Sequence, residues 1–380
     1  MNTDIQTMIQ NAARDFAQNV LAPGAALREK NGAIEPDVIA QMGDLGFLGI
    51  TVSEENGGVG ADYRSYALAL MEIAEGDGAV STMMSVHNAP FCAVLERFGS
   101  DAQRDKWLKP AATGAFIGCF GLTEAHTGSD AKAIKTRAVK TDDGYILNGS
   151  KQFISSARIG GATIVFAVTD PDANKHGISA FYVPNETAGF TVGAPEAKLG
   201  QKASDTCALT FDDMRVSNDM MLGTEGQGLA IALSSLETGR IGIAAQSVGM
   251  AQAALSFAVT YALERTSFGK PIFEHQAIAF KLAEMDAQVE AARQLVLNAA
   301  VVKDTGAPCL REASIAKLIA SEMAERVCSD AIQVLGGYGY LTDYPLERIY
   351  RNVRVCQIYE GTSEIQKINI SRDLAKRYAQ

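Results

Sequence analysis

The spacing of hydrophobic residues in the first third of the chain is typical of α-helices. Four apolar side chains recur three residues apart and share one face of a predicted helix: Ile39, Met42, Leu45 and Leu48. Residues 66–74 are rich in strong helix formers, and glycines within residues 56–60 separate two helical segments. We therefore predict a helical domain over residues 1–115.

The pattern changes to short β-like runs in the middle of the chain. Residues 162–168 and 178–183 are dominated by β-branched, aromatic and small apolar residues. Asp143-Gly144 lies between two further runs of this kind, which is typical of a hairpin turn. Several short strands joined by turns predict a small barrel or sandwich over residues 116–225.

Helical spacing returns over residues 226–380. Apolar residues 4, 3 and 4 positions apart share one helix face: Ile278, Leu282, Met285 and Val289. A second long helix is predicted over 310–335, and a last one begins near Ser363, where Ser363 and Gln366 have the spacing of a capping box. Because the strands are not interleaved with helices, the fold class is α+β, in three domains.

Composition narrows the class of protein. The 380 residues are 47% hydrophobic, and the net charge of −10 argues against nucleic acid and anionic membranes as main partners. The uncharged stretch 241–263 is long enough to span a bilayer. Gln246, Gln252 and several Ser and Thr interrupt it, so we predict a helix buried in a bundle or subunit interface, without membrane insertion.

Targeting signals and cysteine usage indicate a cytoplasmic protein. The N-terminal segment resembles neither a signal peptide nor a transit peptide. The six cysteines are scattered, with no CxxC pair, as is typical of buried free thiols in a reducing compartment.

Several common chemical motifs are absent from the sequence. There is no GxGxxG fingerprint and no GxSxG elbow, and Gly149-Ser150-Lys151 has the wrong order for a P-loop. The four histidines lie far apart without ligand spacing, so no metal site is predicted.

Two segments instead resemble the signatures of a known family. They are Gly118-Cys-Phe-Gly-Leu-Thr-Glu-Ala-His-Thr-Gly-Ser-Asp130, and Gln333-Val-Leu-Gly-Gly-Tyr-Gly-Tyr340 followed by Ile358-Tyr-Glu-Gly-Thr-Ser-Glu364. Residues 147–155, 237–240 and 265–270 fit the same family in the same order. Over nearly its whole length the chain resembles the acyl-CoA dehydrogenases. The resemblance implies an N-terminal helical domain, a middle β-barrel-like domain and a C-terminal four-helix bundle.

The resemblance implies FAD as cofactor, with its isoalloxazine ring held by the middle domain. Thr123 would contact the ring near its reactive edge, while Phe153 and Ser155 would flank and hydrogen-bond it. The family usually has Trp-Ile-Thr at residues 153–155, so Phe153 and Ser155 keep a stacking aromatic and a hydroxyl. The same segments imply further cofactor-binding positions at Phe120, Leu122, Ser129, Thr362 and Glu364; the last two begin a helix, where free N–H groups favour phosphate.

The dinucleotide part of FAD typically crosses a subunit boundary in this family. The residues that would come from a neighbouring copy are Arg265, Phe268, Gln276, Gln333, Gly336 and Gly337. An arginine can bind pyrophosphate through charge-assisted hydrogen bonds, and glycines let the backbone approach closely. The residues alone also fit a structural role for Arg265, as a cation at a helix C-terminus before Gly269.

The family pattern implies that Glu360 is the catalytic base, although such a glutamate taken alone is typical of a surface carboxylate. Some members place the base on the helix just before the residue matching Arg240, where this chain has Gly239. The small Gly239 leaves room for a carboxylate that enters from the Glu360 loop, so Glu237 is the weaker candidate. Substrate-binding positions implied by the resemblance are Ser129, Glu237, Arg240, Tyr359 and Gly361. Arg240 also fits an intrahelical ion pair.

The implied reaction is α,β-desaturation of an acyl-CoA thioester, with electrons passed to an electron-transfer flavoprotein. Residues 236–243 look most like short-chain members, and the family is usually a homotetramer. Residues 125–127 depart from the usual Pro-Gly-Ala of the loop near the CoA arm. Two alternatives stay open: an acyl-CoA oxidase on the same fold, and a flavin-free helical binding protein.

Overall fold

The computed structural model describes residues 2–379, and helices occupy their first third. They are α1 (Asp4–Phe16), α2 (Ala22–Asn31), α3 (Pro36–Asp44), α4 (Tyr63–Gly76), α5 (Gly78–Val86), α6 (Ala93–Phe98), α7 (Asp101–Gln103) and α8 (Lys109–Ala112). The predicted helical face at residues 39–48 is wrong in one respect: α3 ends at Asp44, and Leu45 is 47% exposed. Gly46 has a φ of +75°, which turns the chain away from the helix axis after Leu45.

The middle of the chain forms one mixed sheet. Its strands are β1 (Ile117–Gly121), β2 (Arg137–Lys140), β3 (Gly144–Ser155), β4 (Gly160–Val168), β5 (Ile178–Pro184), β6 (Phe190–Pro195), β7 (Thr206–Ser217) and β8 (Met221–Leu222). Within residues 2–379 this sheet has eight strands in the order β6-β7-β3-β2-β4-β5-β8, with β1 beside β4. The predicted hairpin at Asp143-Gly144 is confirmed, because β2 and β3 pair antiparallel across it.

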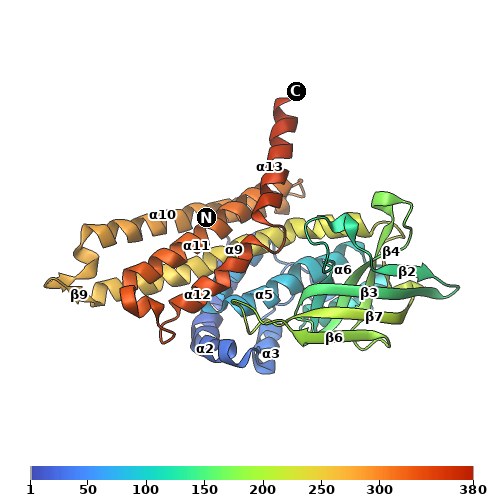
Figure 1. The fold of residues 1–380 in the computed structure, drawn as a ribbon, viewed down its shortest axis with the longest axis horizontal. Helices are drawn as coiled ribbons and strands as arrows, with labels where there is room; N and C mark the ends of the chain where they lie inside the picture. The colour runs from blue at the N-terminus through green and yellow to red at the C-terminus, as the bar shows by residue number, and fades with distance from the viewer. Residues whose placement is uncertain (1, 380) are drawn as a thin grey trace.

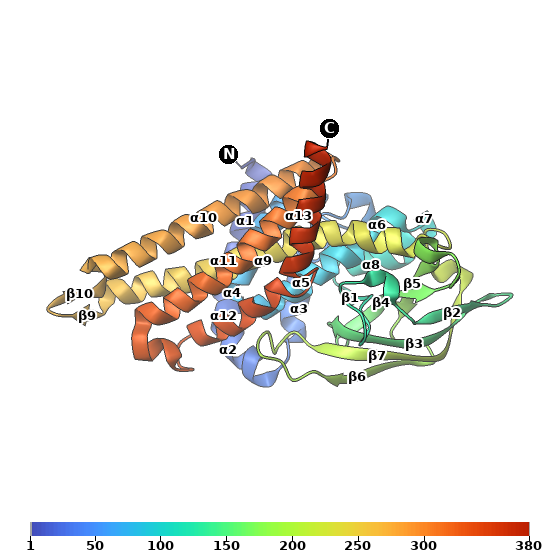
Figure 2. The same ribbon diagram turned by 45° about the horizontal axis from the view of Figure 1, so that its top comes forward.

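The last part of the chain is again helical. It contains α9 (Gly228–Glu264), the short strands β9 (Thr266–Ser267) and β10 (Lys270–Pro271), α10 (Gln276–Asp304), α11 (Leu310–Leu335), α12 (Leu346–Val353) and α13 (Ser363–Tyr378). Helices α9, α10 and α11 lie side by side and point away from the sheet, with the β9–β10 turn at their far tip (Figures 1 and 2). The prediction of a helix over 310–335 is confirmed.

Helix α9 runs through the centre of the molecule and contacts both the N-terminal helices and the sheet (Figure 2). It is the one helix in residues 2–379 that is long and apolar enough to cross a bilayer, but 78% of its most apolar window is buried inside the protein. The prediction of a buried core helix is thus confirmed. Its glycines allow close packing: a Cβ on Gly249 would meet the Met71 carbonyl of α4 at 2.1 Å.

The predicted capping box at the start of the last helix is wrong. The N-cap of α13 is Thr362, whose side chain accepts a hydrogen bond from the Ile365 N–H. The Gln366 side chain turns instead toward the preceding loop. That loop contains Glu360.

Candidate active site

The Glu360 loop has an unusual backbone. It connects the short helix η10 (Arg354–Gln357) to α13, and the φ angles of Glu360 and Gly361 are +53° and +89°. A left-handed conformation is uncommon for a residue with a Cβ, and it persists where surrounding contacts impose it. Two such residues in succession turn the Glu360 side chain back onto α9.

The carboxylate of Glu360 lies over Gly239 of α9. A Cβ built on Gly239 would be 2.5 Å from Oε2 of Glu360 and 2.8 Å from its Cδ. Any side chain larger than hydrogen would therefore compete with the carboxylate for this space. The structure places the carboxylate where the sequence leaves room for one.

The Glu360 carboxylate lacks the partners that normally accompany a buried charge. Within residues 2–379 its Oε2 is buried without a hydrogen bond, and so is Nε of the neighbouring Arg240. Burial raises the pKa of Glu360 to about 7, and the positive charges of Arg240 and Lys317 partly offset this effect. A carboxyl whose pKa lies near neutrality is well suited to take up and release a proton.

Two side chains hold the backbone of this loop from behind. Nζ of Lys317, on α11, donates a hydrogen bond of 2.7 Å to the Gly361 carbonyl. Nε2 of Gln366 donates to the same carbonyl at 2.8 Å and to the Glu360 carbonyl at 3.2 Å. Neither residue could be predicted from the sequence, because each acts through a contact that no local motif encodes.

A buried polar network continues from the loop through Tyr359. Its hydroxyl donates to Gln246 of α9 and accepts from Gln201, which lies in the β6–β7 connection of the middle domain. Both glutamines also hydrogen-bond Thr82 of α5. Gln246 interrupts an apolar stretch of sequence, a signal that could have marked it as a functional residue.

The middle-domain residues of the predicted site gather around β1 and β3. Phe153 sits beside a bulge in β3, has a φ of +60° and is 61% exposed. Nearby, the Gln152 N–H donates to the Thr123 carbonyl at 2.9 Å, and Thr123 and Ser155 are half-buried. The side chains of two further predicted positions face the protein interior more than the surface: Leu122 is 6% exposed, and the Phe120 ring packs on Phe166.

A buried ion pair supports this surface from below. Nζ of Lys151 lies 2.8 Å from Oε1 of Glu124 and donates to the Leu122 carbonyl at 3.1 Å. Glu124 also accepts from the Lys135 and Thr136 N–H groups. The buried pair is thereby hydrogen-bonded to neighbouring backbone groups, which fixes the turn after β1.

The second group of predicted cofactor residues lies at the opposite end of the molecule, near the β9–β10 tip (Figure 1). Arg265 caps the end of α9 and stacks over Tyr338, and Phe268 is 97% exposed. Gln276 begins α10, and Gln333, Gly336 and Gly337 lie at the end of α11. One chain therefore does not bring this group together with Thr123 and Phe153.

Comparison with known proteins identifies the family to which this fold belongs. Three family models match this chain: acyl-CoA dehydrogenase, N-terminal domain, over residues 3–115; middle domain, over 119–214; and C-terminal domain, over 226–375. The chain belongs to the acyl-CoA dehydrogenase family. The predicted fold class and the prediction of an FAD-dependent oxidoreductase are thereby confirmed, and membership argues against the flavin-free alternative.

Similar proteins cover nearly the whole chain. An acyl-CoA dehydrogenase of Bacillus subtilis is 47% identical over 372 residues, 98% of each chain. The structure of butyryl-CoA dehydrogenase from Megasphaera elsdenii superposes with a TM-score of 0.97 at 43% identity, covering 98% of this chain and 99% of that one. A chain in a structure of the electron transferring flavoprotein of Acidaminococcus fermentans gives the same TM-score and identity, with 98% of both chains covered.

The residues present fit the FAD of an acyl-CoA dehydrogenase. The exposed Phe153 ring offers a stacking surface beside half-buried Thr123 and Ser155. At the far tip, Gly336 has a φ of +60°, and no heavy atom of the described chain would contact a Cβ on Gly336 or Gly337 within 4 Å. These features leave open surface at both predicted ends of the cofactor.

The remaining predicted site residues differ in their surroundings. Ser129 and Glu364 are exposed, and Thr362 and Gly361 flank the start of α13. Glu237 is occupied elsewhere: its Oε1 accepts from the Cys309 N–H at the start of α11, and its Oε2 lies 3.8 Å from Lys303. Within the described residues, Glu237 thus forms no ion pair with Arg240.

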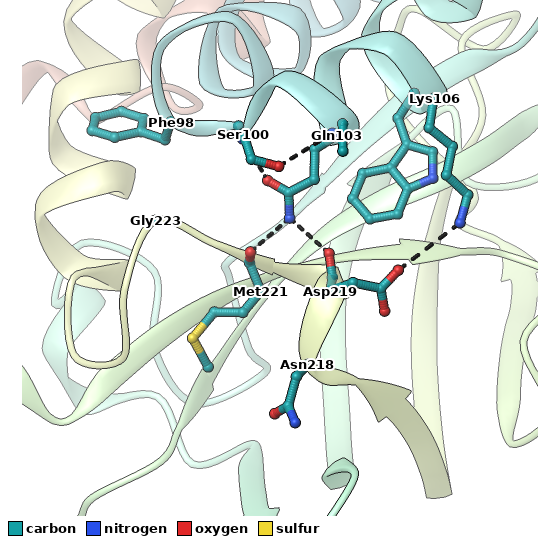
Figure 3. A pocket seen from close by; sticks show the side chains of 11 residues that line it. Phe98, Ser100, Gln103, Lys106, Asn218, Asp219, Met221 and Gly223 are labelled. Carbon is teal, nitrogen blue, oxygen red and sulfur yellow. Dashed lines mark hydrogen bonds and ion pairs between the residues drawn. The ribbon is translucent and has the colours of Figure 1, made fainter.

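The cavity shown in Figure 3 does not coincide with the predicted site. The cavity in Figure 3, of about 430 Å³, lies between α7 and the connection from β7 to β8. Its polar groups are largely paired: Gln103 donates to the Asp219 and Met221 carbonyls, and Lys106 lies 4.0 Å from the Asp219 carboxylate. None of the predicted site residues lines it. No group of three His, Cys, Asp or Glu within residues 2–379 could hold a metal ion.

Proposed function

We propose that this enzyme desaturates a short-chain acyl-CoA with Glu360 as the catalytic base. The observation that carries the proposal is the Glu360 carboxylate, which is buried, free of hydrogen bonds at Oε2 within the described chain, and packed over Gly239. Its pKa of about 7 lets it remain substantially ionised near neutral pH while being basic enough to remove a proton.

The α-proton beside a thioester is weakly acidic, so the developing negative charge needs stabilisation. The Glu360 N–H makes no hydrogen bond within the described residues and is free to donate to the thioester carbonyl. Arg240, buried on the adjoining turn of α9, adds positive charge to the same region. When bound, FAD supplies the acceptor for the hydride that leaves the β-carbon. Thr123, Phe153 and Ser155 would hold its ring, and Ser129, Tyr359 and Gly361 would line the path of the thioester and pantetheine.

The preference for a short chain is supported by the polar network beside the base. Gln246 is fully buried and donates to the Gly78 carbonyl, to Ser81 and to Thr82, while it accepts from Tyr359. A long acyl chain in this direction would displace these hydrogen bonds without replacing them, at about 1–3 kcal/mol for each polar group left unpaired. Butyryl-CoA dehydrogenase of Megasphaera elsdenii is among the similar structures.

The assembly and partners follow the family. We propose a homotetramer, in which Arg265, Phe268, Gln276, Gln333, Gly336 and Gly337 of one copy complete the FAD site of another. The exposure of Phe268, at the tip opposite the sheet, supports this arrangement. An electron-transfer flavoprotein would accept the electrons. A cytoplasmic location is supported by six cysteines that are all free and buried.

Anaerobic flavin bleaching with a panel of acyl-CoAs tests this proposal. Wild type should bleach fastest with butyryl-CoA or a similarly short substrate, and Glu360→Gln should retain FAD but not bleach. If Glu360→Gln bleaches nearly as fast as wild type, Glu360 is not the base. If reduced wild type forms peroxide rapidly on exposure to air, the enzyme is an oxidase. If neither form bleaches although FAD is bound, the acyl-CoA substrate is wrong.

A further inference from the structure

Lys317 is a buried lysine without a carboxylate partner. It is fully buried on α11, and within the described residues its ammonium makes one hydrogen bond, to the Gly361 carbonyl at 2.7 Å. The other fully buried lysine of the described chain, Lys151, forms an ion pair with Glu124 at 2.8 Å. Lysine is rarely buried without a partner, because the charge loses its hydration. The position of Lys317 therefore calls for a functional reason.

The groups around Lys317 come from four other elements. Arg240 faces it from α9, Cys356 from η10, Glu360 from the loop, and the more distant Glu364 from the start of α13. Burial lowers the pKa of Lys317 to about 8, with Cys356 and Glu360 acting in the opposite direction and Arg240 adding to the decrease. Glu364 is exposed, so its charge is screened by water. Glu360 is the buried carboxylate of this cluster.

The same cluster determines the electrostatics of Glu360. Its carboxylate is faced by Arg240 of α9 and Lys317 of α11, both of which lower its pKa, and by the neutral Tyr66 hydroxyl of α4. Arg240 follows Gly239, the residue over which the carboxylate lies, whereas Lys317 reaches the loop from α11 and binds the Gly361 carbonyl. Lys317 thus combines one positive charge with one contact to the strained backbone.

We infer that Lys317 is a positioning residue for the proposed base: its ammonium fixes the Gly361 carbonyl, and its charge keeps Glu360 ionised in the resting enzyme. The inference rests on the proposed role of Glu360. A lysine serves here where a neutral donor would not, since its positive charge adds to that of Arg240 in favouring the ionised form of the buried carboxyl. Lys317 does not touch the substrate in this scheme.

The chain contains a natural control for the geometric part of this role. Gln366 donates to the same Gly361 carbonyl at 2.8 Å, is fully buried, and carries no charge. Loss of Gln366 removes its hydrogen bonds to the Gly361 and Glu360 carbonyls and leaves the charges unchanged. Loss of Lys317 removes both, so the two variants separate position from charge.

The test is the pH dependence of flavin reduction. The second-order rate constant of anaerobic bleaching, measured at low butyryl-CoA concentration over about pH 5 to 9, reports the base of the free enzyme. In Lys317→Met we expect the midpoint of the acid limb to rise by about one pH unit, with a roughly fivefold lower rate at pH 7. Lys317→Arg should keep the wild-type midpoint. Gln366→Met should lower the rate at every pH without moving the midpoint.

FAD content and melting temperature identify variants that fail to fold. A folded, FAD-loaded Lys317→Met enzyme with the wild-type midpoint overturns the inference. If Lys317→Met does not retain FAD, Lys317→Gln takes its place and must differ in midpoint from Lys317→Arg; equal midpoints overturn the inference as well. Glu360→Gln in the same assay separates the proposed role of Glu360 from that of Lys317. If Glu360→Gln bleaches, Glu360 is not the base, whatever the Lys317 variants show.

Discussion

Gly239→Ala tests whether the carboxylate of Glu360 works from its place over α9. The added Cβ would lie 2.5 Å from Oε2, 2.8 Å from Cδ and 3.2 Å from Oε1 of Glu360. Ordinary contact begins at 3.4 Å, so the carboxylate must retreat by about 0.9 Å (3.4 − 2.5). A displacement of about 1 Å from productive geometry costs about 100-fold in rate.

The same substitution should not weaken the fold. Alanine is favoured over glycine by about 1 kcal/mol in a helix interior, and Gly239 lies well inside α9. We therefore expect a melting temperature equal to or above that of wild type, normal FAD absorbance, and anaerobic bleaching by butyryl-CoA about 100-fold slower. Thr260→Ala, at an exposed position of the same helix, should bleach at the wild-type rate.

The reasoning is refuted by a Gly239→Ala enzyme that folds, binds FAD and bleaches within about twofold of wild type. That result would mean that the carboxylate acts from another position, or that the reacting carbon is reached by another group. A slow enzyme with a lowered melting temperature would instead point to a shift of α9, and FAD content measured alongside the rate distinguishes the two cases.

Three further perturbations probe the rest of the molecule. Gln246→Ala should raise the bleaching rate with hexanoyl-CoA relative to butyryl-CoA by about tenfold, because it removes the buried amide that hydrogen-bonds Tyr359. Gln252→Ala, on the same helix, is the control and should leave this ratio unchanged. An unchanged ratio in Gln246→Ala would mean that Gln246 does not limit chain length. Lys151→Met should lower the free energy of unfolding by about 3–5 kcal/mol and weaken FAD retention, since it leaves the buried Glu124 carboxylate without its lysine. Lys140→Met, which breaks an exposed pair with Glu225, should leave the free energy of unfolding nearly unchanged in the same denaturation assay. Burial lowers the pKa of His87 from its ordinary 6.5 to about 4, so the unfolded chain binds the proton more readily than the folded one. The free energy of unfolding should therefore fall by up to about 3 kcal/mol as the pH drops from 6.5 toward 4. Melting curves of His87→Gln should show a smaller loss of stability over that pH range, and an equal loss in both proteins would contradict the lowered pKa of His87.

Local patterns were sufficient to predict much of the fold. The helix over residues 310–335 and the hairpin at Asp143-Gly144 follow from periodicity and turn chemistry, which act over a few residues. The placement of the Glu360 carboxylate over Gly239 could also be anticipated, because a missing side chain on a packed helix must be filled by something else. The prediction that Leu45 lies on a buried helix face was wrong, because hydrophobic spacing carries no information on where a glycine, here Gly46, ends a helix.

The residues that hold the loop could not be predicted in the same way. Gln366 has the spacing of a capping partner. Its side-chain amide instead donates to the carbonyls of Glu360 and Gly361 in the left-handed turn. Lys317 lies 44 positions from the carbonyl it binds, and Gln201 lies 158 positions from Tyr359. No helical or strand period extends over such separations, so these contacts exist only once the bundle has packed.

The chemistry of Glu360 therefore belongs to the packed bundle more than to its own short motif. Helix α9 supplies the space and one positive charge, α11 supplies the second charge, and α13 fixes the carbonyls of the turn. Through Tyr359 the same loop is tied to Gln201, which the Asn352 side chain and backbone hold in place against α12. Because Gln201 belongs to the domain that would hold the flavin ring, this chain of hydrogen bonds ties the loop of the proposed base to that domain. If Glu360 is the base, its distance from the flavin would then be set by contacts between domains, and the loop need not be rigid by itself.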